Sequence, residues 1–104
     1  MKFGLRTEEL DFILKTIKAQ LDPSQKAKVF LFGSRATGKF KTFSDIDLLV
    51  GAIPVLTGAQ KDVLEEAFEE SELPYKVALV LEHQLQPSFR PIVDSEKVLT
   101  GIIQ

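Results

Sequence analysis

The chain has no cysteine among its 104 residues, which excludes disulfide bonds and thiolate-ligated metal sites. It also lacks an apolar run suited to a membrane span, and charged residues interrupt its N-terminus before a signal peptide could form. Both absences fit a reducing compartment, so we expect a cytoplasmic protein with no membrane partner. The net charge is −2, from 13 basic and 15 acidic residues, and gives no general attraction to nucleic acid.

Length and composition predict one small domain. A chain of 104 residues can bury one hydrophobic core but leaves no room for a second module with its own core. Hydrophobic residues make up 44% of the chain and charged residues 27%, the balance of a folded globular protein. We therefore expect residues 1–104 to form a single domain, as a monomer or a small homo-oligomer, with any further acceptor-binding surface supplied by another protein.

The spacing of apolar residues predicts alternating helices and strands. Apolar residues at helical spacing indicate a helix, and a short apolar run indicates a buried strand. The expected elements are, in chain order, a helix over 7–21 with Thr7 as N-cap, strands over 27–32 and 46–50, a helix that starts at a capping box of Thr57 and Gln60, a strand over 75–81 and a short helix over 88–94. This order predicts an α/β (α+β) domain with a small mixed β-sheet flanked by helices.

Two carboxylates, Asp45 and Asp47, are the first candidates for chemistry. They are separated by one residue at the start of a predicted strand, and side chains two positions apart on a strand share a face. Together they could hold a hard divalent cation such as Mg²⁺, which prefers oxygen ligands and keeps waters or phosphates in its other positions. Taken alone, such a pair is more often a cap or a solvated turn.

Gly33 and Ser34 are the second candidates, because they follow directly after the first predicted strand. Free backbone donors at such a turn can face a phosphate, and glycine allows close approach. The Ser34 hydroxyl adds a donor, and Arg35 or Lys39 adds positive charge. A Gly-Ser pair alone is usually an ordinary turn, but adjacent strands would bring this turn and the carboxylate pair together.

The combined pattern resembles the GS…SDxD signature of the DNA polymerase beta superfamily of nucleotidyltransferases. Asp45 follows Ser34 by eleven residues, Ser44 precedes it, and an apolar run follows Asp47. Length, the predicted N-terminal helix and the segment 74–77 are most similar to the minimal nucleotidyltransferases of bacteria and archaea. This resemblance implies that Gly33, Ser34, Arg35 and Ser44 hold a nucleoside triphosphate, and that Asp45 and Asp47 are catalytic and bind Mg²⁺.

One position departs from the family pattern. Members usually carry a third carboxylate on the strand after the second long helix, where this chain has Ala78. That carboxylate would complete a metal site and help to activate the attacking hydroxyl. Glu82 lies four residues further, about 13 Å along a strand, too far to replace it. Three explanations stand: a natural binding-only member, an introduced inactivating substitution, or slow chemistry that one metal ion supports.

The resemblance implies two alternative functions. In the first, the chain transfers AMP from ATP to a hydroxyl of a protein acceptor and acts as antitoxin to a HEPN-domain toxin, with activity impaired at Ala78. In the second, it keeps the fold but neutralises or scaffolds its partner by binding alone, without catalysis. Enzymes that modify aminoglycosides or extend nucleic acids are disfavoured, because such relatives usually need added domains to hold their acceptor.

Overall fold

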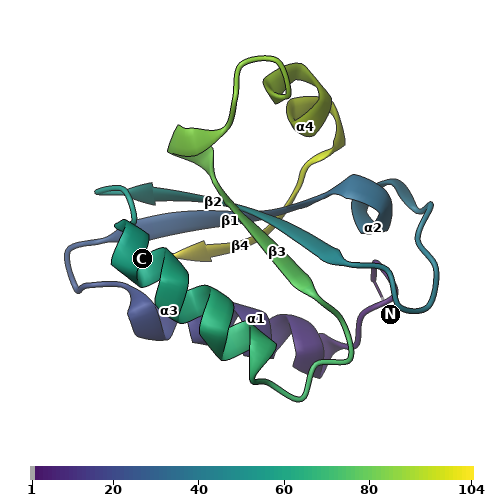
Figure 1. Ribbon diagram of the computed structural model, residues 1–104, viewed down its shortest axis with the longest axis horizontal. Coiled ribbons are helices and arrows are strands. Elements are labelled where there is room, and N and C mark those ends of the chain that lie inside the picture. The colour runs from purple at the N-terminus through teal and green to yellow at the C-terminus, as the bar shows by residue number, and fades with distance from the viewer. Residues whose placement is uncertain (1) are drawn as a thin grey trace.

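Four strands form one mixed sheet in the computed structural model, which describes residues 2–104 (Figure 1). The strands are β1 (Lys26–Phe32), β2 (Ile46–Ile53), β3 (Val77–Leu81) and β4 (Val98–Ile103). Their order across the sheet is β3-β2-β1-β4. β1 is antiparallel to both β2 and β4, whereas β2 and β3 are parallel. The predicted fold class, a small mixed sheet with helices, is confirmed.

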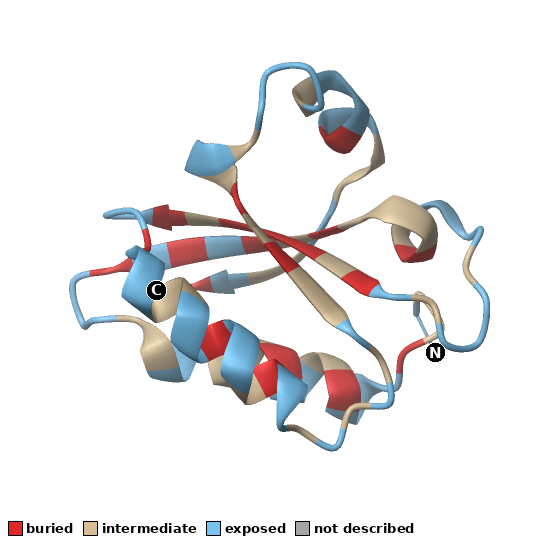
Figure 2. Cartoon of the chain, in the orientation of Figure 1, coloured by how far each residue is buried: buried red, intermediate tan, exposed pale blue. Residues whose placement is uncertain are grey.

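Two long helices, α1 (Thr7–Gln20) and α3 (Gly58–Glu69), cover one face of this sheet (Figure 1). Their apolar faces and the facing strand residues make the main core, seen as buried segments where helices meet the sheet (Figure 2). Fully buried members include Ile17 of α1, Leu64 of α3, and Val29, Leu31 and Leu48 of the strands. Burial of these side chains is the main contribution that holds the two layers together.

The opposite face of the sheet carries only short elements. These are α2 (Gly33–Thr37), the 3₁₀ turn η1 (Glu82–Gln84) and α4 (Arg90–Glu96). α4 lies over this face (Figure 1), where Leu49 of β2 and Val93 of α4 are buried apart from the main core. The alternation along β2 directs Asp47, Leu49 and Gly51 to this second face. The candidate carboxylate Asp47 therefore faces away from the two long helices.

Several local predictions are confirmed. Thr57 caps α3 by accepting a hydrogen bond from the Gln60 backbone N–H, and the Gln60 side chain accepts one from the Thr57 N–H. α1 begins at Thr7 as expected, but the N-cap is Arg6, whose backbone N–H donates to the Glu9 carboxylate at 2.9 Å. The short C-terminal helix exists as α4, shifted by two residues toward the C-terminus, with a proline in its first turn.

Other boundaries differ because of tertiary pairing. β2 was expected to end at Val50 but continues through Gly51, which pairs with Lys28 of β1. Gly51 lies inside the strand and does not terminate it, and the end of the flexible Glu82 side chain packs where a Cβ atom would stand. α2 and β4 were not predicted. Among the described residues, no helix has the length and apolar character to cross a membrane.

Candidate active site

Strand pairing brings the two candidate motifs into contact. Phe32, the last residue of β1, is paired with Asp47 of β2. The next residue, Gly33, has a φ of +73° and begins α2. A Cβ atom built at Gly33 would collide with Asp47 Oδ2, so the glycine backbone lies directly against this carboxylate. Gly33 therefore meets two requirements that other residues fail, a left-handed φ and space for the neighbouring carboxylate.

The two aspartates differ in their surroundings. Asp45 is exposed just before β2, whereas Asp47 is half-buried as the second residue of that strand. Burial raises the pKa of Asp47, and the negative charges of Asp45 and then Glu96 raise it further. The site thus carries unbalanced negative charge, which a divalent cation would relieve.

The donor set fits a hard ion such as Mg²⁺, because both candidate ligands are carboxylates. Within residues 2–104, no three acidic or histidine side chains are grouped closely enough to hold one ion. Asp45 and Asp47 would therefore supply two ligands at most and leave the other positions to water and substrate oxygens, an arrangement that Mg²⁺ commonly adopts.

Ala78 occupies the position directly beside Asp47. The parallel register pairs Asp47 of β2 with Ala78 of β3. Paired residues on neighbouring strands are about 5 Å apart and share a face, so a carboxylate at position 78 would join the pair. Glu82 does not replace it, because this side chain lies against Gly51 and pairs with Arg90, with Nη1 and Oε1 3.9 Å apart.

Ser34 is the second residue of α2 and is partly exposed beside Gly33. Its backbone N–H belongs to the first turn, where a helix has no internal partner for its donors. Among the described residues, no side-chain hydrogen bond involves the Ser34 hydroxyl, so both groups are free to meet a ligand. The α2 turn ends at Gly38, which has a φ of 82°.

Arg35 corrects a prediction of direct phosphate contact. Only 1% of this residue is exposed, and the guanidinium points into the protein. It donates to the backbone carbonyls of Ser44 (Nε 3.0 Å, Nη2 2.9 Å), Phe3 (Nη1 2.9 Å) and Thr42 (Nη2 3.4 Å). Its positive charge satisfies carbonyl groups, and the side chain is not open to a triphosphate.

Aromatic contacts hold the same guanidinium from the sides. Arg35 Cζ is 4.3 Å from the ring centre of Tyr75 and 5.3 Å from that of Phe40. Arg35 therefore ties α2 to the N-terminal segment, to the loop before Asp45 and to the segment before β3. These contacts hold the segments around the site in place.

Ser44 also has a structural role in this loop. Its carbonyl accepts from Arg35, and its hydroxyl accepts from the Lys41 backbone N–H at 2.7 Å. Beside it, residues 41–44 line a hollow of about 560 Å³, in which Phe43 is 70% exposed. This loop therefore offers an open aromatic side chain close to Asp45.

Glu96 is the residue that sequence reasoning missed. It is the last residue of α4, and its charge contributes to the raised pKa of Asp47. The register explains its position, since Val98 of β4 pairs with Leu31, one residue before the Phe32–Asp47 pair. No local pattern marks Glu96, because its location depends on β4, which the sequence did not predict.

Comparison with known proteins identifies the family of this chain. A sequence model of the nucleotidyltransferase domain family matches residues 13–100, which is most of the chain. The chain belongs to this family. It is also 42% identical over 92 residues to the "probable protein adenylyltransferase MntA" of Haemophilus influenzae, covering 88% of this chain and 78% of that protein.

Two solved structures share the nucleotidyltransferase fold. A crystal structure described as a toxin-antitoxin with AMP-PNP has a TM-score of 0.73 and 23% identity, covering 88% of this chain and 72% of that one. The MNT antitoxin structure in complex with tri-AMPylated Shewanella oneidensis HEPN toxin has a TM-score of 0.69 and 21% identity, covering 93% of this chain and 72% of that chain. At this identity the two structures support the fold of the family.

Proposed function

We propose that this chain is a minimal nucleotidyltransferase that moves AMP from ATP to a hydroxyl of a protein partner. The observation that carries the proposal is the contact between Gly33 and Asp47, which puts a turn with free backbone donors beside a negatively charged carboxylate pair. The similarity to MntA supports adenylyl transfer to protein. The fold similarity to an MNT antitoxin in complex with a HEPN toxin supports a HEPN-domain partner and an antitoxin role.

Each residue of the site would have a separate role in AMP transfer. Gly33, which has no side chain, lets the triphosphate approach the backbone, and Ser34 donates from its N–H and hydroxyl. Asp45 and Asp47 would hold Mg²⁺, which would supply positive charge to neutralise the phosphates and the developing charge on the reacting oxygens. The acceptor oxygen forms a bond to the α-phosphorus, the bond to pyrophosphate breaks, and water takes the hydroxyl proton. Arg35 keeps the loop before Asp45 in place.

Ala78 limits the rate in this mechanism. A carboxylate at position 78 would stand beside Asp47 and add charge stabilisation that this chain lacks. The loss of one such electrostatic group typically costs about 10²–10³-fold in rate. Transfer by this chain is therefore slow, whereas ATP binding depends on groups that are present.

The test is AMP transfer from labelled ATP to a HEPN-domain protein co-expressed from the same genome, with mass spectrometry to detect added AMP. We expect slow, Mg²⁺-dependent transfer, acceleration by about 10²-fold in Ala78→Asp, and loss in Asp45→Asn. Calorimetry with Mg²⁺ and ATP measures binding separately. Absence of both ATP binding and transfer, in the natural chain and in Ala78→Asp, would refute the enzyme proposal.

Ala78 favours a second candidate function, in which the chain neutralises its partner by binding without catalysis. The Asp47–Ala78 pairing is the specific observation behind it, because it removes a group that the reaction normally uses. The discriminating variant is Asp45→Asn with Asp47→Asn, which abolishes metal binding but keeps side-chain size. If this double variant still neutralises a co-expressed toxin in full, docking is the function; if protection is lost while the complex forms, transfer is the function.

A further inference from the structure

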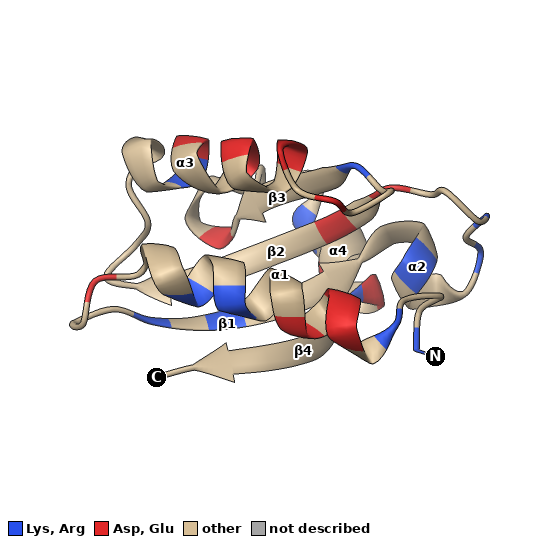
Figure 3. Cartoon of the chain, turned by 90° about the horizontal axis from the view of Figure 1, so that it is seen from below, with Lys and Arg blue, Asp and Glu red and all other residues tan. Residues whose placement is uncertain are grey.

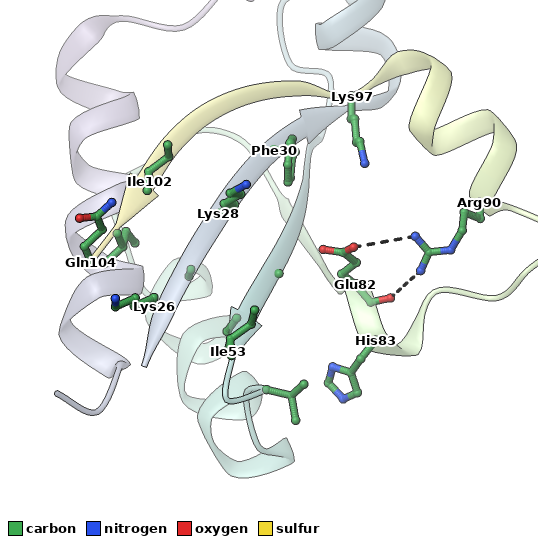
Figure 4. Close-up of a pocket in the computed structure, with 15 residues that line it drawn as sticks. Lys26, Lys28, Phe30, Ile53, Glu82, His83, Arg90, Lys97, Ile102 and Gln104 are labelled. Atoms are coloured by element: carbon green, nitrogen blue, oxygen red, sulfur yellow. Dashed lines mark hydrogen bonds and ion pairs between the residues drawn. The ribbon is translucent and has the colours of Figure 1, made fainter. Parts of the chain in front are cut away.

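A hollow of about 690 Å³ lies on the open face of the sheet, away from the candidate active site (Figure 4). Its floor is formed by β1, β2 and β4, and η1 and α4 stand at one side. A volume of this size is typical of binding pockets. Nothing in the proposed reaction uses it.

The hollow is separate from the site of Asp47. Gly51, which lines the hollow, is four residues further along β2, about 13 Å away. Between them lies Leu49, which is fully buried on the same face of the strand. A ligand in the hollow therefore does not reach the carboxylate pair directly.

Among the charged residues that line this hollow, basic ones outnumber acidic ones, although the chain as a whole carries a net charge of −2. Lys26, Lys28, Arg90 and Lys97 line it, with Glu82 as the acidic residue. Arg90 is paired with Glu82, and Lys97 with Asp94, with Nζ and Oδ1 2.9 Å apart. Figure 3 shows the contrast, with acidic residues along α3 and basic residues on β1.

Of the four basic residues that line the hollow, Lys26 and Lys28 have no ion-pair partner among the described residues. Both are exposed, and neither forms an ion pair within residues 2–104. They are two residues apart on β1, so their side chains share one face about 7 Å apart (Figure 4). Carboxylates at positions i and i+2 of an extended peptide have the same spacing.

The rest of the lining is mostly apolar, with His83 and Gln104 as its polar residues. Ile53 and Ile102 line it with 80% and 54% of their surface exposed. Phe30 is the aromatic residue of the floor, and Lys97 Nζ covers its ring at 4.9 Å from the centre. The Phe30 ring is therefore covered and is not an open platform for a nucleic-acid base.

We propose that this hollow binds an extended acidic segment of the protein partner, with two carboxylates spaced i, i+2 on Lys26 and Lys28 and an apolar side chain next along the same face. The inference rests on the proposed function in one respect, that the partner is a protein. The positive charge of the two lysines favours an acidic segment. The apolar floor favours a peptide that also carries an apolar side chain over a simple anion. Docking at this distance holds the partner while a different part of it reaches Asp45 and Asp47.

The experiment measures fluorescence anisotropy of a short labelled peptide that contains Glu-Ser-Glu-Ser-Leu. We expect saturable binding that weakens with salt, no binding of the same peptide with lysine in place of glutamate, and about tenfold weaker binding to Lys26→Glu with Lys28→Glu. The matched control is Lys15→Glu with Lys18→Glu, the same charge change on exposed residues of α1. Circular dichroism checks that both double variants are folded.

Three results would overturn the docking site. They are equal losses in the two double variants, tighter binding of a single-stranded oligonucleotide that competes with the peptide, and self-association of the chain that blocks the peptide. Failure of the proposed function is visible separately, since calorimetry with Mg²⁺ and ATP on the chain alone measures the site of Asp45 and Asp47, which Lys26 and Lys28 do not line. Peptide binding without transfer refutes only the enzyme, and transfer without peptide binding refutes only the docking site.

Discussion

Replacement of Arg35 by lysine separates a structural role of this side chain from a role in phosphate binding. Lysine keeps the positive charge and most of the length, but it offers one ammonium in place of a planar fork of donors. The guanidinium donates to carbonyls of Phe3, Thr42 and Ser44, and a single ammonium cannot meet all three. Arg35→Lys therefore leaves buried carbonyl groups without partners.

The size of this effect follows from the hydrogen bonds and ring stacking that lysine cannot provide. A hydrogen bond from a charged donor contributes about 1.5–3 kcal/mol, and stacking of a guanidinium on aromatic rings adds about 0.5–2 kcal/mol. Lysine still serves one carbonyl, and the bond to Thr42 is long at 3.4 Å, so the loss is about one strong hydrogen bond and part of the stacking. We therefore expect the free energy of unfolding to fall by about 2–4 kcal/mol. In a domain of this size that corresponds to a melting temperature lower by about 10 °C or more. Since small domains are stable by about 5–15 kcal/mol, the variant stays folded in mild conditions.

Urea unfolding followed by circular dichroism measures this decrease in stability. The matched control is Arg6→Lys, where the side chain is 66% exposed and its nearest ion-pair distance, to Glu9, is 3.6 Å; we expect a change within about 0.5 kcal/mol there. Calorimetry with Mg²⁺ and ATP on the folded variants gives the second readout. If Arg35→Lys is as stable as the natural chain and only binds ATP more weakly, Arg35 contacts phosphate and the structural role is refuted.

Three further substitutions test the candidate active site and the start of helix α3. Burial and the charge of Asp45 raise the pKa of Asp47, so the folded state holds this proton more tightly than the unfolded state, and ionisation lowers stability as pH rises above 3.8. Asp47→Asn should therefore stabilise the metal-free protein at neutral pH, and thermal unfolding should show this gain vanishing in acid. Gly33→Ala should displace the Asp47 carboxylate and weaken Mg²⁺ binding in calorimetry by tenfold or more, on the order of 1.4 kcal/mol, whereas Gly38→Ala, with open space for its Cβ, should leave Mg²⁺ binding unchanged. Gln60→Ala removes a donor to the Gln20 carbonyl at 2.8 Å and the α3 capping box, so urea unfolding should show a loss of about 1–3 kcal/mol; no loss would mean that water replaces these bonds.

Local signals in the sequence accounted for most of the architecture. Apolar spacing located both long helices and three strands, and the Thr57–Gln60 capping box located the start of α3. These patterns are visible in the sequence because they depend on residues that are close together along the chain. β4 was missed, since Val98–Ile103 becomes a strand only through its pairing with β1. α2 was missed because its five residues, which begin with Gly33, are too few for a periodic signal.

The sequence by itself determined the candidates for chemistry. Gly33, Ser34, Asp45 and Asp47 stand out by residue type and spacing, and the departure at Ala78 is visible without coordinates. Only the tertiary structure decided how these residues meet: the β1–β2 register sets Gly33 against Asp47, and the β2–β3 register sets Ala78 beside it.

The tertiary structure also decided which charges are available. Arg35, a candidate for phosphate by its place after Ser34, is buried, because the carbonyls of distant segments fold around its guanidinium. Glu96 and the pair of Lys26 and Lys28 gained their significance in the same way, from strands that pair across the sheet. Residue type and local spacing determine what a side chain can do, whereas contacts between distant segments determine whether it is exposed and what lies beside it.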